Sequence, residues 1–545
     1  MGNGDYPRWL KRYHQPGPWA RWRIRQWQQG LSRQMRFSLL LVEADSAPLA
    51  LLSQTLRSLA LQLYPHWEVL LQGRTPPDWR SDLPARWVAG GWNTLLQQAQ
   101  GDYCAILYPG DRLARHALSA VAGAINAQPD ALMFYSDEDL WDSTGPQQPQ
   151  CKPDWNPYLF YSRNYLGAAV WYQRRAVLVG GGFQRADVHT QQFALRLRLL
   201  AQHRTPVHLP YLLWHSAAYH PTSDALRAEV LRPQLTATPQ PQGGLRLHYP
   251  LPDVLPSVTV IVLTRDRLDL LSRCVASLQQ TLYPALHLCI VDNGSTDPAT
   301  LAYLTQLPPV LDIGLTRLTT QVLRQTTPFN FSALNNTAVA ATDSEILVLL
   351  NNDIEILEPG WLLEMLQYAV QPEVGVVGAK LLYPNRQVQH AGVTLGVGGI
   401  ARHRGLGLPA DAPGYLGRAL AVQTLSAVTA ACWVLRRAVY HALDGLDPEL
   451  SVSYNDVDFC LRAGQRGYQI IWTPHAVLLH HESASRGEDV RPEHRERALR
   501  EYSYLEARWG PVLHHDPAYS PNLATDTLEA LAYPPRILPL WHIDG

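Results

Sequence analysis

Carboxylate and amide side chains directly follow apolar runs at three places in the second half of the chain. They are Thr264-Arg265-Asp266 after 258–263, Asp292-Asn293-Gly294-Ser295 after 286–291, and Asn351-Asn352-Asp353 after 346–350. A carboxylate at the end of a buried strand costs desolvation free energy unless it is paired or binds something. A helix N-cap explains any one of these groups, but three of them on one sheet edge favour a ligand site.

Asp353 is the candidate for holding a divalent cation. Carboxylate oxygen suits Mg²⁺ or Mn²⁺, which commonly bridge a protein carboxylate to substrate phosphates. His480 or His481, after the apolar run 476–479, would add a nitrogen ligand, which manganese tolerates better than magnesium. An ordinary loop histidine is the alternative for either.

Asp456 and Asp458 open a predicted helix and, two residues apart, do not share a helix face. We expect Asp458 to form an ion pair with Arg462 and Asp456 to point into a cleft, where it can act as a general base. The small, basic loop 483–487 suits closure over a pyrophosphate, with Arg486 neutralising charge. A generic surface turn is the alternative for that loop.

The elements that must position these groups occur twice along the chain. A strand over 37–42, a helix over 49–63 and a strand over 68–71 make a βαβ unit, and 258–263, 268–281 and 286–291 repeat it. We therefore predict an α/β fold with two sheets, mostly parallel and flanked by helices. The polar positions of the second copy are lost from the first, where Gly73, Gly110 and Gln192 align with Asp292, Asp353 and Asp456. This loss predicts one working site, in the second copy.

Composition narrows the class of protein and the domain organisation. The chain has 545 residues, 46% of them hydrophobic and 17% charged, with a net charge of −1, so we expect globular domains and no nucleic-acid partner. Its six scattered cysteines indicate reduced thiols and a cytoplasmic location. The predicted parts are an N-terminal arm (1–35), a first domain (36–234), a Pro-rich linker (235–256), a catalytic domain (257–510) and a tail over the surface of that domain (511–545).

The N-terminal arm mixes arginine and tryptophan, which suits the surface of an anionic membrane. A helical arm packed against the first domain is the alternative that we favour. No apolar run is long enough for a membrane span.

Residues 257–490 resemble an inverting family 2 glycosyltransferase of the GT-A fold. The resemblance rests on five pieces in the family's order: 258–264, 291–297, 350–355, Asn455-Asp456-Val457-Asp458 and His480-His481-Glu482-Ser483. The first half resembles the paired N-terminal domain of the same family, through 135–139 and 152–157. The similar proteins are bacterial transferases that build O-antigen, capsule or other surface polysaccharides.

The resemblance implies a nucleotide-diphosphate sugar donor, a saccharide or lipid-linked saccharide acceptor, and Mn²⁺ or Mg²⁺. Asp292 would hold the nucleobase, Thr264 and Asp266 would line the nucleotide pocket, and Asp456 would be the base. Asp353 and His480 would be the metal ligands. We also expect substrate contacts from Asn336, Asn352 and His390, the last in a segment (390–424) that shapes the acceptor side. Asn351 and Asn455 depart from the family's usual Asp and Glu.

Three other functions fit the sequence less well. A non-catalytic scaffold that binds sugar nucleotides would not need Asp292, Asp353 and Asp456 together. A nucleotidyltransferase would need glycines after the first strand, which Thr264-Arg265-Asp266-Arg267 lacks. A dinucleotide oxidoreductase would need a G-x-G-x-x-G motif there, and neither first strand has one.

Overall fold

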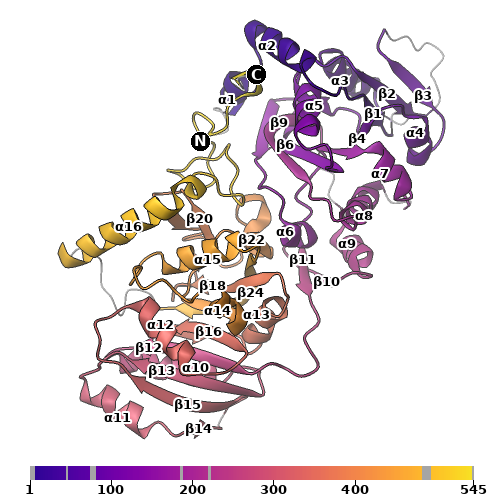
Figure 1. The fold of residues 1–545 in the computed structure, drawn as a ribbon. Coiled ribbons are helices and arrows are strands. Elements are labelled where there is room, and N and C mark those ends of the chain that lie inside the picture. Colours follow the sequence, from indigo (N-terminus) through magenta and orange to yellow (C-terminus); the bar gives the residue numbers. More distant parts are fainter. Residues whose placement is uncertain are drawn as a thin grey trace. The chain divides into compact units, whose positions relative to one another are not determined.

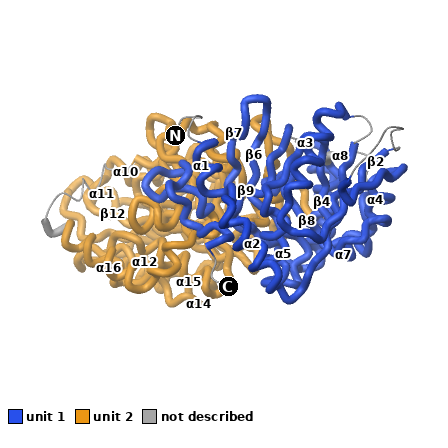
Figure 2. The backbone as a smooth tube through the Cα atoms, turned by 90° about the horizontal axis from the view of Figure 1, so that it is seen from above, with its two compact units in different colours: residues 1–155, 164–231, 519–545 blue, residues 156–163, 232–518 orange. Residues whose placement is uncertain are grey.

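The fold is that of a computed structural model that describes residues 6–43, 47–73, 82–184, 188–218, 222–312, 314–481 and 492–542. The chain divides into two compact units (Figures 1 and 2). Unit 1 comprises residues 1–155, 164–231 and 519–545, and unit 2 comprises residues 156–163 and 232–518.

Unit 1 is built on one sheet with the strand order β3-β2-β1-β4-β8-β6-β9-β5, with β7 paired to β6. Its elements are α1 (Tyr6–Tyr13), α2 (Pro18–Gln29), β1 (Phe37–Leu41), α3 (Leu49–Ala60), β2 (Trp67–Gln72), β3 (Ala85–Val88), α4 (Trp92–Gln98), β4 (Tyr103–Leu107), β5 (Arg112–Leu113), α5 (Ala117–Ala127), β6 (Met133–Asp142), β7 (Gly145–Gln150), β8 (Val170–Gln173), α7 (Arg174–Val179), α8 (Val188–Leu200), β9 (Val207–Ser216), α9 (Asp224–Leu231) and η2 (Leu540–His542).

Unit 2 has a larger sheet with the order β14-β15-β13-β12-β16-β23-β18-β24-β17, to which β19 and β22 add. Its elements are α6 (Pro157–Ser162), β10 (Thr236–Pro239), β11 (Leu245–His248), β12 (Val258–Thr264), α10 (Leu268–Leu278), β13 (Ala285–Asp292), α11 (Pro298–Gln306), β14 (Val310–Leu311), β15 (Arg317–Arg324), α12 (Phe331–Ala340), β16 (Ile346–Asn351), β17 (Ile354–Ile356), α13 (Trp361–Ala369), β18 (Val374–Leu382), β19 (Val388–His390), β20 (Val393–Leu395), β21 (Ala401–His403), η1 (Tyr415–Leu420), β22 (Gln423–Leu425), β23 (Cys432–Arg436), α14 (Arg437–Ala442), α15 (Asn455–Gln465), β24 (Gln469–His480) and α16 (Pro492–Leu513).

The two sheets have the same topology. In unit 1, β1 lies parallel to β2 and β4, β4 and β8 are antiparallel, and β6 is parallel to β9. In unit 2, β12, β13, β16, β23, β18 and β24 repeat those pairings in the same senses. The prediction of an α/β fold with two related sheets is therefore confirmed.

The sheets are mixed rather than mostly parallel. Strand β23 runs antiparallel to both β16 and β18, and β8 does the same between β4 and β6. Sequence periodicity finds βαβ units, because a helix separates their parallel strands. It does not give the direction of a strand such as β23, which follows a long irregular excursion rather than a helix.

Two segments differ from the domain boundaries expected from sequence. The expected linker contains the hairpin β10–β11, and Arg246 on it donates to Glu364 Oε2 at 2.7 Å. The expected C-terminal tail over the second domain is instead divided, because residues 519–545 belong to unit 1. There Asn522 Nδ2 donates to Asp137 Oδ2 at 2.8 Å, and Ala532 O accepts from Trp9 Nε1 at 2.7 Å.

The acidic run on β6 is part of the folding of unit 1. Asp139 accepts from Tyr6 OH at 2.5 Å and faces His215 Nδ1 at 2.7 Å, so it anchors α1. Asp137 faces His208 Nε2 at 2.9 Å, and Glu138 pairs with Lys152 at 3.4 Å. These carboxylates are buried, and their partners offset the cost of burial.

Candidate active site

The polar groups that end the central strands of unit 2 lie at one edge of the sheet. In the parallel register Thr264 pairs with Asp292, and Leu263 pairs with Asn351. Asn352 Nδ2 donates to Thr264 Oγ1 at 3.2 Å, which links the first and third groups. The carboxyl ends of parallel strands meet at this edge, so the structure brings together Thr264, Asp292 and Asn352, as the strand pattern predicts.

Asp292 is almost fully buried and already has partners at this edge. Its Oδ1 accepts from Ser295 N at 2.9 Å, and its Oδ2 accepts from Arg324 Nη1 at 2.7 Å. The Arg324 side chain is 50% exposed, so this ion pair reaches solvent. Arg324, on β15, was not among the residues predicted for the site, because a lone arginine in a polar strand carries no sequence signal.

Asp266 holds a loop in place. It adopts a left-handed backbone conformation with φ of 53°, and its Oδ1 accepts from Asp297 N at 2.7 Å and from Thr296 N at 2.5 Å. The hydrogen bond from Asp297 N is the main reason that the pKa of Asp266 is lowered. Asp297 itself caps α11 by accepting from Thr300 N at 2.8 Å.

Asp353 and His480 form a close pair at the same edge. Their Oδ1 and Nε2 atoms are 3.1 Å apart, and both side chains are buried. His480 Nδ1 lies 3.2 Å from Gln389 Oε1, which orients the ring. His481 turns away, with Nε2 2.9 Å from Glu355 Oε2, because successive side chains of a strand point to opposite faces.

The donor set of Asp353 and His480 fits a divalent cation that takes its remaining ligands from substrate phosphates. Within the ranges that the structure describes, no group of three or more His, Cys, Asp or Glu side chains is arranged to hold a metal ion by itself. Two protein ligands alone would leave the other coordination positions of such a cation to substrate and water.

Asp456 lies in the first turn of α15. Its Oδ1 accepts from Val457 N at 2.8 Å, and its Oδ2 accepts from Ala430 N at 3.3 Å. Burial raises the pKa of the Asp456 carboxyl, although these hydrogen bonds and nearby His403 act in the opposite direction. The residue as a whole is half-buried.

Asp458, two residues on, has a structural environment. It is fully buried, with Oδ2 2.7 Å from Arg462 Nε, while its Oδ1 accepts from Trp509 Nε1 at 2.9 Å and lies 3.1 Å from Arg508 Nη1. The ion pair with Arg462 is the one that the four-residue spacing predicts.

Two histidines lie between Asp456 and the Asp353–His480 pair. His390 is fully buried, and its Nδ1 is 3.1 Å from His403 Nδ1. Burial, and then the nearby His403 and His480, lower the pKa of His390 well below its usual value. Thr429 N donates to His390 Nε2 at 3.4 Å, so a neutral His390 carries its proton on Nδ1 and donates to His403.

The loop 429–431 joins these groups. Ala430 N contacts Asp456, and Ala431 O accepts from Asn351 N at 3.0 Å at the end of β16. His390, which was predicted to contact substrate, thus bonds to the same loop as the candidate base. His403 was expected only within the segment 390–424, and its place opposite His390 depends on the hairpin β20–β21.

One predicted residue, Asn336, does not join the site. Asn336 on α12 forms hydrogen bonds with the segment 440–446. Its Oδ1 accepts from Tyr440 OH at 2.6 Å and from Leu446 N at 3.0 Å, and its Nδ2 donates to Leu446 O at 2.8 Å. The expected substrate contact from Asn336 is replaced by this structural role. Arg486 and its loop lie outside the described residues.

Unit 1 has different residues at the matching positions. Gln192 lies in α8, the counterpart of α15, and the match is fixed by Arg198 and Arg462. Arg198 donates to Gly180 O and Gly182 O, and Arg462 donates to Leu443 O and Gly445 O. Gln192 Oε1 accepts from Arg196 Nη2 at 3.0 Å, and Arg196 is 1% exposed, so a packed polar network stands where Asp456 stands in unit 2.

Gly110 leaves no room for a carboxylate in unit 1. Its φ is +99°, and a Cβ there would lie 2.6 Å from the Cβ of Ala217. An aspartate at this position would therefore require the surrounding backbone to move.

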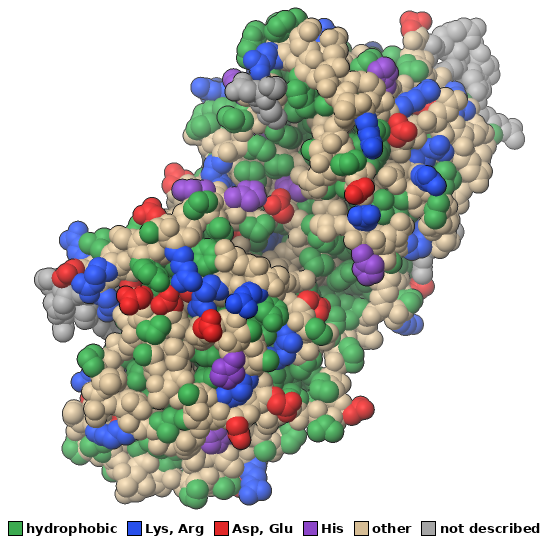
Figure 3. All heavy atoms as spheres, in the orientation of Figure 1, with side chains coloured by type: hydrophobic (Ala, Val, Ile, Leu, Met, Phe, Trp, Pro, Cys, Tyr) green, Lys and Arg blue, Asp and Glu red, His purple; other side chains and the backbone are tan. Residues whose placement is uncertain are grey.

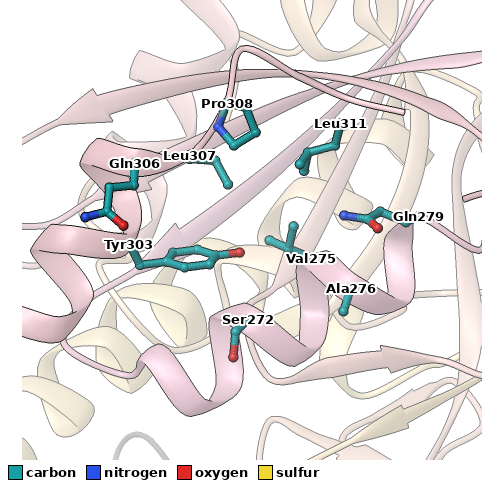
Figure 4. A pocket seen from close by; sticks show the side chains of 9 residues that line it. All are labelled: Ser272, Val275, Ala276, Gln279, Tyr303, Gln306, Leu307, Pro308 and Leu311. Atoms are coloured by element: carbon teal, nitrogen blue, oxygen red, sulfur yellow. The ribbon is translucent and has the colours of Figure 1, made fainter. Parts of the chain in front are cut away.

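A cavity of about 430 Å³ lies apart from the candidate site, between α10 and α11 (Figure 4). Its walls are mostly apolar and include Val275, Tyr303 and Leu311. Within the described part of the chain, none of the residues predicted for the site lines it.

Residues 259–443, which lie within unit 2, match the family model described as Glycosyl transferase family 2.

Two curated relatives match most of the chain. The protein named "Uncharacterized protein y4gI" of Sinorhizobium fredii is 36% identical over 529 residues, which cover 89% of this chain and 57% of the relative. The O-antigen biosynthesis protein RfbC of Myxococcus xanthus is 33% identical over 569 residues, which cover 96% of this chain and 43% of the relative. The chain thus spans about half the length of these relatives.

Solved structures resemble parts of the chain more distantly. The mannosyltransferase PcManGT of Pyrobaculum calidifontis, in complex with GDP-Man and Mn²⁺, is 18% identical with a TM-score of 0.34, covering 48% of this chain and 71% of that one. GalNAc-T7 with UDP, GalNAc and Mn²⁺ is 12% identical with a TM-score of 0.36, covering 47% of this chain and 50% of that one.

Proposed function

We propose that the chain is an inverting glycosyltransferase that moves a hexosyl or deoxyhexosyl group from a nucleotide-diphosphate donor to an acceptor hydroxyl. The acceptor is a saccharide or a lipid-linked saccharide of bacterial surface polysaccharide, assembled on the cytoplasmic side. The observation that carries the proposal is that the loop 429–431 joins Asp456, as a candidate base, to Asn351, whose Nδ2 lies 3.4 Å from Nε2 of His480 in the Asp353–His480 pair, within a region that matches the family 2 model. The relation to an O-antigen biosynthesis protein supports the polysaccharide context.

The chemistry is a single displacement. Asp456 accepts the proton of the acceptor hydroxyl, whose oxygen attacks the anomeric carbon from the face opposite the diphosphate. The bond between that carbon and the diphosphate oxygen breaks, and the configuration inverts. The hydrogen bond between His390 and His403 fixes the orientation of both imidazole rings near the base. The rings would therefore be in place before substrate binds.

Asp353 and His480 would hold Mn²⁺ or Mg²⁺, which supplies positive charge to the leaving diphosphate when it is bound. Thr264, Asn352 and Asp292 lie at the same sheet edge and would contact the nucleotide, with Arg324 beside Asp292. Asp266 would act through the loop 295–297 that it holds.

Unit 1 would serve as a structural or acceptor-handling partner without a donor site of its own. The network of Gln192 and Arg196, and the lack of space at Gly110, support this assignment.

The test is release of nucleoside diphosphate from a panel of nucleotide sugars with Mn²⁺, measured with and without saccharide acceptors. We expect one donor to be turned over and its product to carry the inverted linkage. Retention of configuration would reject the single displacement. Tight binding of a nucleotide sugar without turnover on any acceptor would favour the non-catalytic scaffold instead.

A further inference from the structure

The tryptophans of the N-terminal helices divide into two groups. Trp9 on α1 is fully buried, and Trp27 on α2 packs so closely on α5 that a Cβ at Gly123 would clash with its ring. Trp19 and Trp22 on α2 are instead 56% and 57% exposed. Three residues apart, they lie side by side on the outer face of the helix. The inner face is fixed by buried Ala20 and Ile24.

The charge around the two exposed tryptophans is positive. Residues 6–42 include eight Lys and Arg and no Asp or Glu. Arg25 is exposed, and Arg21 donates from Nε to Pro16 O at 2.9 Å. Arg23 lies over the Trp19 ring, 5.5 Å from its centroid. In the described ranges, neither Arg21 nor Arg25 has a carboxylate partner, so their charges face solvent.

Neighbouring segments of unit 1 continue this surface. Burial, and then the positive charge of Arg21, lower the pKa of Arg115. The helix η2 packs against α2, where the Trp19 ring centroid is 6.0 Å from that of His542. Leu538, just before η2, is 64% exposed. In Figure 3, apolar and basic side chains lie next to each other over α2.

We propose that the outer face of α2, comprising Trp19, Trp22, Arg21 and Arg25, binds the surface of a bilayer that contains anionic phospholipid. Tryptophan rings favour the headgroup region of a bilayer, where the indole is partly apolar and its N–H stays hydrated. Arginines beside them are attracted to anionic lipid, with an effect that falls off within a Debye length. A soluble acidic partner would satisfy the arginines but would leave two exposed indoles unexplained.

The outer face of α2 is part of folded unit 1, so the test must leave α2 in place. Deleting residues 1–35 would remove Trp9 and Ile24 from the core of unit 1, so loss of binding would have no clear meaning. The test therefore uses the full chain with two double variants, Trp19→Ala/Trp22→Ala and Arg21→Gln/Arg25→Gln. The matched control is Leu499→Ala/Arg500→Gln, which removes an exposed apolar and an exposed basic residue from α16.

The measurement is cosedimentation with vesicles of phosphatidylcholine alone or mixed with phosphatidylglycerol, without donor or acceptor present. We expect binding to the anionic vesicles that weakens with salt, and a loss of about fivefold in partition coefficient for each arginine removed. The tryptophan variant should also bind more weakly, and the control should bind like the unchanged chain. Thermal melting shows whether each variant is folded.

Brominated lipid provides a second readout. It should quench part of the tryptophan fluorescence of the unchanged chain but less of that of Trp19→Ala/Trp22→Ala, against a background of 17 tryptophans. The proposal is wrong if anionic vesicles do not bind at low salt, or if the tryptophan variant binds and is quenched like the unchanged chain. Dependence on the arginines alone, or self-association lost in the tryptophan variant, would identify a soluble acidic partner or a second copy instead. None of these outcomes depends on whether sugar transfer occurs.

Discussion

Replacing Asp456 by asparagine separates the chemical role of this carboxylate from its structural cost. Asparagine keeps the shape of the side chain and one oxygen, which can accept from Val457 N, while its amide nitrogen takes the place of the oxygen that accepts from Ala430 N at 3.3 Å. It cannot take up the proton of an acceptor hydroxyl. A positioned general base contributes about 10²–10⁴-fold to a rate, which corresponds to about 3–5 kcal/mol of activation free energy. We expect a loss of turnover of that size, with donor binding retained.

The same substitution should not destabilise the fold. Burial raises the folded-state pKa of Asp456 above its unfolded value, so the protonated carboxyl is the better accommodated form. The stability from this difference is present below the unfolded pKa and is lost as pH rises through the folded pKa. At neutral pH the ionised carboxylate therefore costs stability, and its removal offsets the loss of the long hydrogen bond from Ala430 N, so Asp456→Asn should melt close to the temperature of the unchanged chain.

Asp458→Asn is the matched control, two residues away on the same helix. Asp458 is fully buried and paired with Arg462 and Arg508. Removing one charge of a buried pair typically costs about 3–5 kcal/mol. This variant should therefore melt lower but keep its turnover per folded molecule.

The assay is release of nucleoside diphosphate at saturating donor and acceptor, with melting followed by circular dichroism. For the unchanged chain, kcat/KM should rise with pH through a pKa above the usual aspartate value, because the base must be ionised. Near-normal turnover in Asp456→Asn, or an equal loss in Asp458→Asn, would refute the assignment of the base.

Three further substitutions test the metal pair and the two halves of the chain. His480→Ala should raise the Mn²⁺ concentration needed for half-maximal transfer about tenfold or more, and His481→Ala should not; equal effects would reject the Asp353–His480 pair. Gly110→Ala should destabilise the protein by about 1–3 kcal/mol in a denaturant titration, more than Gly145→Ala, which has a similar positive φ but open space around its Cβ. Gln192→Ala should leave the rate of transfer unchanged, and a loss comparable to that of Asp456→Asn would make unit 1 catalytic.

The sequence predicted the sheet edge but not the hairpin that completes the site. Thr264, Asp292 and Asn352 each follow a buried strand, so their meeting at one edge follows from parallel pairing. The contact between His390 and His403 depends on β20–β21, a hairpin of short strands within an irregular segment. Periodicity carries no information on such a pairing.

The misplaced Asn336 has a similar explanation. It lies on α12, but its direction is decided by contacts with Tyr440 and Leu446, more than a hundred residues away in the chain. Sequence spacing gives the face of a helix, not what that face meets. The choice between His480 and His481 likewise required the register of β24 against β17, in which His480 faces Ile354.

The return of residues 519–545 to unit 1 has a consequence for biosynthesis. Asn522 and the carbonyl of Ala532 complete contacts with Asp137 and Trp9, and they leave the ribosome after all of unit 2 has been made. Unit 1 therefore cannot reach its final packing until unit 2 and residues 519–545 have been synthesised, although its strands are made first. A protease cut or gene fusion point in 232–256 would leave residues 519–545 of unit 1 on the fragment that carries most of unit 2, and residues 156–163 of unit 2 on the fragment that carries most of unit 1. The two halves should consequently be inherited and exchanged together rather than as separate modules.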